Sequence, residues 1–124
     1  MSKCIFCEIP NERIHLENAL AIAIMDNYPV TPSHSLIIPK RHIDNYFLLT
    51  EPESLACFEL LNDAKDFILR TDNTVEGFNI GMNCGEVAGQ TIFHCHIHLI
   101  PRRVGDVDSP RGGVRHLIPG MGDY

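Results

Sequence analysis

The sequence predicts an α+β domain with an antiparallel sheet, and three observations support this fold class. One segment carries apolar residues at helical spacing, two segments alternate apolar and polar residues, and two short Ile-rich runs are separated by turn residues. Short strands therefore outnumber helices, and the sequence contains no internal repeat. The length of 124 residues suits one compact domain with a hydrophobic core of its own.

Two apolar runs near the start of the chain, residues 19–25 and 35–38, are typical of neighbouring strands. Residues 27–33 between them contain two prolines and an asparagine. These residue types interrupt helices and favour turns. We therefore expect two strands joined by a loop.

Residues 51–70 have the pattern of an amphipathic helix. Thr50 is placed to cap the first turn, with Pro52 in that turn and Glu53 at the third helical position, which is a capping box. Apolar residues then recur on one side of the helix at Cys57, Leu60, Leu61, Ala64 and Ile68. This helix is the most secure local prediction.

Two alternating segments follow the helix, at residues 77–83 and 91–100. A glycine-flanked loop, residues 84–89, separates them and can return the chain. We therefore expect an antiparallel hairpin with a short loop. Beyond Pro101 the alternation ends.

The composition excludes several classes of protein. Hydrophobic residues make up 44% of the chain and charged residues 21%, as in ordinary globular proteins. Ten basic against sixteen acidic residues give a net charge of −6, which argues against a partner that is DNA or RNA. The apolar runs are too short to cross a membrane, and the first residues do not resemble a secretory signal. We expect a cytoplasmic protein without a membrane partner.

Three histidines at alternate positions, His94, His96 and His98, carry the clearest chemical signal. In a strand they would project from one face, because alternate side chains share a face. Three such rings can hold one catalytic zinc ion, or one ring can act as a nucleophile with its neighbours as orienters and donors. The following residues, Leu-Ile-Pro-Arg-Arg, suit an anion better than a cation.

The segment from His94 to Ile100 resembles the His-φ-His-φ-His-φ-φ signature of the histidine triad (HIT) family of nucleotide hydrolases and transferases, where φ is an apolar residue. Two further blocks resemble the same family in the same order. They are the segment Ile5-Phe-Cys-Glu-Ile9, and Met25-Asp26 followed by the block from His34 to His42.

This resemblance implies a five-stranded antiparallel sheet with one long helix and one or more short helices, paired as a homodimer. The HIT domain would span residues 1–103. Residues 104–124 would form a C-terminal tail that packs on or near the active site.

The resemblance also implies nucleotidyl transfer at an α-phosphate. His96 would attack phosphorus to form a nucleotidyl-imidazole intermediate, and His98 would donate a hydrogen bond to a phosphate oxygen. Asp26 would accept hydrogen bonds from the ribose hydroxyls, while Ile5, Phe6, Ile9 and Ile24 would line the base pocket. The nucleotide-binding residues expected in this way are Ile9, Asp26, His34, Asn83, Gln90, Thr91, His96 and His98.

A second site is expected at the N-terminus. The pair Cys4-x-x-Cys7 alone is a weak signal, and an odd count of five cysteines argues against a disulfide framework. Members of the HIT family with such a pair bind a structural zinc ion. The resemblance therefore implies Zn²⁺ held by Cys4, Cys7, His42 and His94.

The residues after the triad favour one branch of the family. The chain lacks the Trp-Pro-Pro-Gly-like ending of the phosphoramidase branch and is closer to dinucleoside polyphosphate hydrolases. We expect hydrolysis of a substrate of the diadenosine tetraphosphate type, with an adenine nucleotide as ligand. Arg111 or Arg115 would lie near the distal phosphates.

Four alternatives stay open at this point. Within the family, the chain can be a nucleoside phosphoramidate hydrolase or a phosphorylase that transfers the nucleotidyl group to phosphate. From other classes, it can be a non-catalytic nucleotide-binding regulator or a metallohydrolase with a triple-histidine zinc site.

Overall fold

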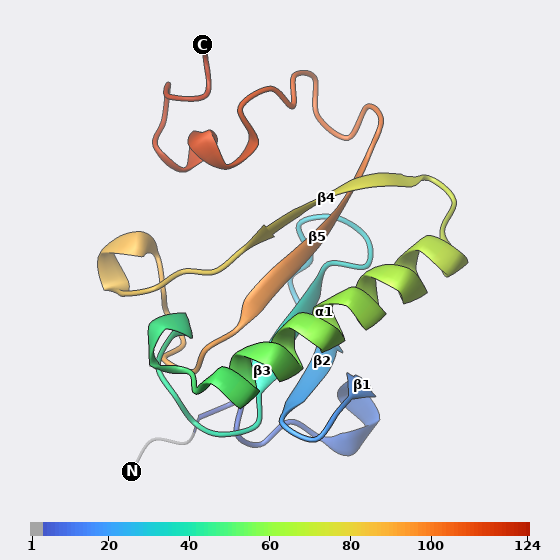
Figure 1. Cartoon of the computed structure of the whole chain (residues 1–124). Coiled ribbons are helices and arrows are strands. Elements are labelled where there is room, and N and C mark those ends of the chain that lie inside the picture. Colours follow the sequence, from blue (N-terminus) through green and yellow to red (C-terminus); the bar gives the residue numbers. More distant parts are fainter. Residues whose placement is uncertain (1–3) are drawn as a thin grey trace.

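A five-stranded antiparallel sheet, covered on one face by a long helix, forms the body of the protein (Figure 1). This computed structural model describes residues 4–124. The sheet order is β1-β2-β3-β5-β4. The elements are β1 (Ile14–Glu17), β2 (Ala21–Met25), β3 (Ser35–Pro39), α1 (Glu51–Thr71), β4 (Val75–Gly81) and β5 (Ile97–Arg103), with short 3₁₀ helices η1 (Asn11–Arg13), η2 (Tyr46–Leu48), η3 (Glu86–Ala88) and η4 (Gly113–Leu117). The predicted fold class is confirmed.

Helix α1 begins at the predicted capping box. The Thr50 hydroxyl accepts the Glu53 backbone N–H at 3.3 Å, and the Glu53 carboxylate accepts the Thr50 N–H at 2.9 Å. Arg41 donates to both carboxylate oxygens of Glu53, each at 2.8 Å. The start of the helix is thereby tied to the segment that follows β3.

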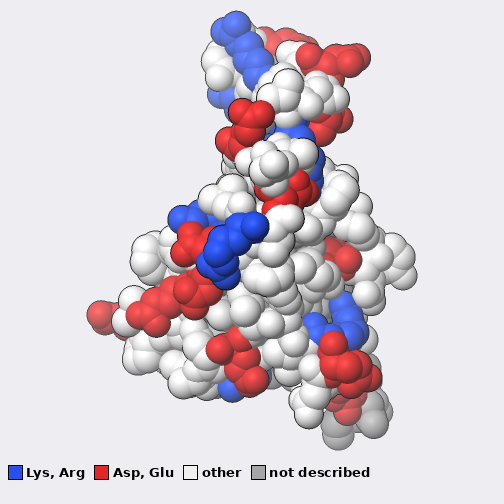
Figure 2. Space-filling model, turned by 90° about the vertical axis from the view of Figure 1, so that its right-hand side faces the viewer, with Lys and Arg blue, Asp and Glu red and all other residues white. Residues whose placement is uncertain are grey.

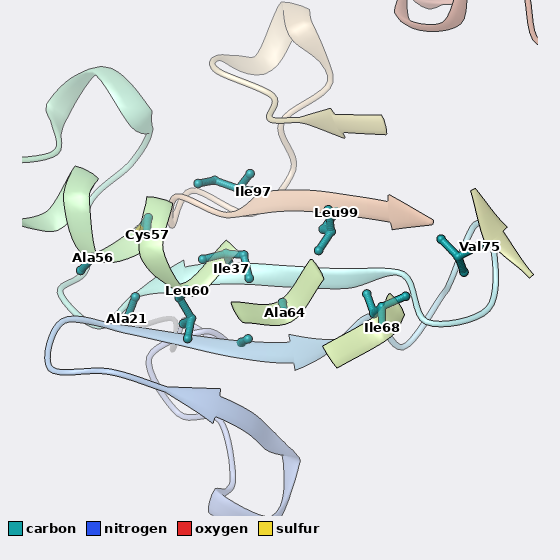
Figure 3. Packing of buried hydrophobic residues seen from close by; sticks show 11 residues of the cluster. Ala21, Ile37, Ala56, Cys57, Leu60, Ala64, Ile68, Val75, Ile97 and Leu99 are labelled. Atoms are coloured by element: carbon teal, nitrogen blue, oxygen red, sulfur yellow. The ribbon is translucent and has the colours of Figure 1, made fainter. Parts of the chain in front are cut away.

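The helix buries its apolar face against the central strands. Cys57, Leu60, Ala64 and Ile68 pack on residues from β2, β3 and β5 (Figure 3). Burial of such side chains stabilises a fold by about 25 cal/mol per Å² of apolar surface. Because α1 covers one face of the sheet, the opposite face can form contacts with other side chains.

The register of the strands places His98 on that opposite face. Ile14 pairs with Ile24, Ile24 with Leu36, and Leu36 with His98, so these four side chains form one row across the sheet. Phe6, from the N-terminal segment, packs on the same face beside Ile24 and Leu36. His98 is therefore flanked by apolar side chains.

One local prediction is wrong: the second alternating segment is not a strand throughout. Strand β5 begins at Ile97, so His94 and His96 precede it, and the connection from β4 is longer than expected. The reason is that this connection bonds to another loop instead of to β4. The Cys95 N–H donates to the Ile43 carbonyl at 2.7 Å, and the Gln90 amide donates to the Asp44 carbonyl at 2.7 Å.

The C-terminal tail leaves the sheet after β5 and stands apart from the body as a separate lobe (Figures 1 and 2). Arg102 anchors its start through Asp106, at 2.7 and 2.8 Å. Val107 and Val114 of the tail line a hollow together with Val30 from the loop before β3.

Charges of both signs are interspersed on the face that Figure 2 shows. In residues 4–124, no helix is long and apolar enough to span a membrane.

The ion pair at the start of α1 makes stability depend on pH. The hydrogen bonds from Arg41, then those from Thr50, lower the pKa of Glu53 from 4.5 to about 2. This carboxylate stabilises the folded state above pH 4.5, and the contribution is lost as the pH falls towards 2. We expect Glu53→Gln to lower the free energy of unfolding at pH 7 by about 1–2 kcal/mol.

Urea unfolding at several pH values checks this expectation. The difference between wild type and Glu53→Gln should shrink as the pH falls below 4.5. Glu51→Gln is the matched control, because Glu51 is an exposed acid of the same turn. A difference that is the same at pH 7 and pH 3 would contradict the assignment.

Candidate active site

A hollow of about 340 Å³ on the face opposite α1 brings together most of the predicted nucleotide-binding residues. Its apolar part includes Ile5, Phe6, Ile24 and Leu36. Six of the eight predicted residues line it, namely Asp26, His34, Asn83, Thr91, His96 and His98.

Two predicted residues do not line this hollow. Ile9 packs against the apolar cluster that contains Phe6. Gln90 is 3% exposed, and its amide bonds the backbone of Gly85, Asp44 and Ile92. Its hydrogen-bonding groups therefore hold the connection before β5 in shape.

The arginines that follow the triad make their contacts outside this hollow. Arg102 pairs with Asp106, and Arg103 pairs with Asp72 at 2.8 Å. Arg111 and Arg115 each lie 4.7 Å from the ring centre of Tyr124 in the tail. None of these four arginines lines the hollow.

Sequence reasoning missed Arg13 and Leu36. The cation in the lining of the hollow is Arg13, which donates to the Met25 carbonyl at 3.0 Å. Nothing in the local sequence of Arg13 indicates this position. Leu36 could have been found by pairing the two expected strands, because the pairing of β3 with β5 places Leu36 beside His98.

His96 is positioned with one ring nitrogen free. Its Nδ1 lies 2.8 Å from the His94 carbonyl oxygen. A carbonyl only accepts hydrogen bonds, so Nδ1 of His96 carries a proton, and in the neutral ring the lone pair is on Nε2. The Phe6 ring lies edge-on to the His96 ring, with 5.0 Å between centroids. The arrangement leaves Nε2 as a nucleophilic nitrogen.

His98 lies beside His96 and contacts a second buried ring. The ring centroids of His96 and His98 are 5.2 Å apart. Nδ1 of His98 lies 2.9 Å from Nε2 of His34, which in turn is 3.5 Å from a carboxylate oxygen of Asp26. Burial, with smaller effects from His96 and His34, lowers the pKa of His98 to about 4. His98 is therefore neutral near pH 7.

The chain reaches His34 through an unusual backbone turn. Ser33 has a φ of 72°, in the left-handed region that residues other than glycine rarely adopt. The Ser35 hydroxyl donates to the Ser33 carbonyl at 2.9 Å and supports the turn. His34 then enters the sheet with a side chain that is 2% exposed.

A second group of ligand-type residues lies next to the hollow. The atoms of Cys4, Cys7, His42 and His94 that can bind a metal all lie within 4.8 Å of one another. Nδ1 of His94 is 3.4 Å from the Cys4 sulfur and 3.2 Å from Nδ1 of His42. The Cys7 sulfur is 3.2 Å from Nδ1 of His42. A tetrahedral zinc ion with bonds of about 2.0–2.3 Å spaces its ligands by similar distances.

The hydrogen bonding of His94 fits metal binding. Nε2 of His94 lies 2.8 Å from the Pro39 carbonyl oxygen, so this nitrogen carries the proton. Nδ1 therefore faces the two sulfurs with a lone pair, as a metal ligand requires. Two thiolates and two neutral imidazoles form a donor set that zinc prefers. These four residues can hold a metal ion.

The two buried cysteines, Cys57 and Cys95, lie outside this cluster. Burial raises the pKa of Cys57 to about 11 and that of Cys95 to about 12. Both thiols are therefore protonated at neutral pH and behave as small apolar side chains of the core.

Comparisons with known proteins identify the family to which the chain is similar. The HIT domain family matches residues 8–105. An uncharacterized HIT-like protein of Mycoplasma genitalium is 39% identical over 107 residues, which cover 82% of this chain and 74% of the relative.

Two solved structures share the fold. A Zn-bound histidine triad family protein from Mycobacterium smegmatis has a TM-score of 0.76 at 32% identity, covering 86% of this chain and 79% of that protein. A HIT family hydrolase from Clostridium thermocellum has a TM-score of 0.68 at 32% identity, covering 86% and 96%. On the fold, the histidine arrangement and these similarities together, the chain belongs to the HIT domain family.

Proposed function

We propose that this protein is a nucleotidyl hydrolase that cleaves dinucleoside polyphosphates at an α-phosphate through a covalent intermediate on His96. The single observation that carries the proposal is the hydrogen bond from Nδ1 of His96, a residue that lines the hollow, to the His94 carbonyl. In the neutral ring this bond leaves the lone pair of Nε2 free. A binding protein without turnover has no use for a nucleophile at this place.

The reaction proceeds in two displacements. Nε2 of His96 attacks the α-phosphorus, a P–N bond forms, and the P–O bond to the remaining polyphosphate breaks. Water then attacks the same phosphorus and breaks the P–N bond. The products are a nucleoside monophosphate and the free imidazole. His98 stabilises both steps by donating a hydrogen bond to a nonbridging oxygen.

The other groups of the hollow fit a nucleoside. The apolar side chains Ile5, Phe6 and Ile24 offer surfaces for a base, and Asp26 offers a carboxylate to the ribose hydroxyls. Diadenosine tetraphosphate is the substrate we propose. A phosphoramidate hydrolase or a phosphorylase would use the same nucleophile, so the leaving group and the acceptor have to be compared by assay.

We further propose that Cys4, Cys7, His42 and His94 hold a structural zinc ion. A zinc ion with four protein ligands supplies cross-linking and no open coordination position. It would join the N-terminal segment, which carries Phe6, to the connection that carries His94. The chemistry then belongs to His96 and His98.

We also propose a homodimer. Strand β4 lies at one edge of the sheet, and its residue Ile80 is 51% exposed. Leu55, Phe58 and Leu69 are exposed on one flank of α1, at helical spacing. An open edge strand and exposed apolar side chains both favour pairing with a second copy. We place the tail, residues 104–124, near the active site, because Val107 and Val114 share a hollow with Val30, which also lines that site.

The first prediction from the proposed function concerns the nucleophile. After brief exposure to diadenosine tetraphosphate at mildly acidic pH, intact mass spectrometry should find an AMP adduct on wild type and none on His96→Ala. The kcat of the variant should fall by roughly 10³-fold or more. His15→Gln is the control, because His15 does not line the hollow.

An adduct that persists in His96→Ala would contradict the assignment of the nucleophile. Turnover without an adduct, abolished at once by a chelator, would favour a metal-activated water instead. The same assay with a phosphoramidate of AMP, and with added inorganic phosphate, separates the alternatives.

The second prediction concerns the metal. We expect about one zinc ion per chain by elemental analysis, and its loss in Cys7→Ser. That variant should unfold at a clearly lower temperature, because structural zinc contributes on the order of 10 kcal/mol in small zinc domains. Cys84→Ser is the matched control and should keep the metal. Stoichiometric zinc in Cys7→Ser would refute the ligand set.

The third prediction concerns the dimer. Light scattering after size exclusion should give a dimer mass for wild type and a monomer mass for Phe58→Glu, since a buried charge opposes an apolar interface. Phe47→Glu is the control, because Phe47 is 79% exposed on η2 and not on α1. A dimer that survives Phe58→Glu would place the interface elsewhere.

A further inference from the structure

A backbone N–H group dictates the protonation of the buried His34 ring. The backbone N–H of Val30 donates to Nδ1 of His34 at 3.0 Å. A backbone N–H can only donate, so Nδ1 of His34 must be the bare nitrogen. The ring is then neutral, with its proton on Nε2.

The proton on Nε2 of His34 has two acceptors within reach. Nδ1 of His98 lies at 2.9 Å, and a carboxylate oxygen of Asp26 lies at 3.5 Å. Only the shorter distance is that of a normal hydrogen bond. Nδ1 of His98 is therefore the acceptor and carries no proton itself.

His98 must consequently hold its own proton on Nε2, the nitrogen that is not occupied by His34. We propose that His34 is a positioning residue that locks His98 into the tautomer with Nε2–H, so that His98 is a hydrogen-bond donor before any nucleotide binds. The chain of donors runs from Val30 N–H to His34 and from His34 to His98. This inference rests on the proposed function, because it assigns His98 its role towards a phosphate oxygen.

The hydrogen bond from Val30 also argues against a metal site formed by Asp26, His34 and His98. Asp26, His34 and His98 have metal-ligand residue types and lie as close together as the cysteine cluster does. A metal on Nε2 of His34 would force the proton to Nδ1, opposite the Val30 N–H. Two donors would then face each other at 3.0 Å. The backbone at Val30 thus selects a hydrogen-bonded pair of rings over a metal ion.

Burial agrees with neutral rings in this chain. The pKa of His34 is lowered by desolvation, and the nearby Asp26 carboxylate opposes this effect. A cationic His34 would again carry a proton on Nδ1, facing the Val30 N–H. Both geometry and burial therefore hold His34 neutral.

Nuclear magnetic resonance of the ¹⁵N-labelled wild-type protein tests the inference directly. Long-range ¹H–¹⁵N correlation spectra distinguish protonated from bare ring nitrogens. We expect Nε2–H tautomers for both His34 and His98 at pH 7, without nucleotide. An Nδ1–H tautomer or a rapidly exchanging mixture at His98 would overturn the inference, whether or not the protein hydrolyses nucleotides.

A pair of substitutions tests the dependence of His98 on His34. His34→Gln keeps an N–H donor near the position of Nε2, whereas His34→Met has similar length and no donor. In His34→Met we expect a mixture of His98 tautomers. The kcat with diadenosine tetraphosphate should fall about 10- to 100-fold, with KM changed little, as when a supporting hydrogen bond of a functional residue is lost.

His34→Gln should retain the wild-type tautomer of His98 and most of the kcat. Thermal unfolding of both variants shows whether they are folded. An equal loss of kcat in folded His34→Gln and His34→Met would show a role for His34 other than donation. A wild-type His98 tautomer in His34→Met would also refute the inference, while wild-type protein with the expected tautomers and no turnover would reject only the proposed function.

Discussion

Backbone groups decide which nitrogen of His34, His94 and His96 carries the proton, and the candidate active site depends on this constraint. The Pro39 carbonyl assigns the proton of His94 to Nε2, and the His94 carbonyl assigns that of His96 to Nδ1. The two rings are chemically identical, yet one presents Nδ1 and the other Nε2 as the free nitrogen. One residue type can thus supply both a metal ligand, at His94, and a nucleophile, at His96.

The two sites are also connected through the covalent chain. His94 contributes its side chain to the cysteine cluster and its carbonyl to His96. Phe6 lies between Cys4 and Cys7 in sequence and contacts the rings of both His94 and His96. Anything that fixes the cysteine cluster therefore also fixes the orientation of the His96 ring and one wall of the hollow. This connection explains why a metal at the cluster would affect catalysis without touching the substrate.

Much of the fold could be predicted from local patterns, whereas the site depended more on resemblance. The start of helix α1 could be predicted from Thr50 and Glu53, because a capping box is a local interaction. The sequence pattern places the start of β5 too early, because the alternation of apolar and polar residues continues through His94 and His96. The backbone there bonds to the loop at Ile43 instead. The role of Gln90 follows from a loop 46 residues away along the chain and has no local signal. Patterns in a single sequence do not reveal hydrogen-bond partners that lie far apart along the chain.

The charge around the triad bears on how the proposed hydrolase would bind a phosphate and release it. Arg102 and Arg103 follow the triad in sequence, but Asp106 and Asp72 neutralise them outside the hollow. His98 is neutral, since burial lowers its pKa to about 4. The cation that lines the hollow, Arg13, donates to the Met25 carbonyl, so a phosphate near His96 would be met mainly by oriented neutral donors such as His98. Such donors favour the charge that develops on phosphoryl oxygens, and they hold a product monophosphate less tightly than fixed cations would. A hydrolase with a charged product benefits from this arrangement, because binding energy is concentrated on the transition state.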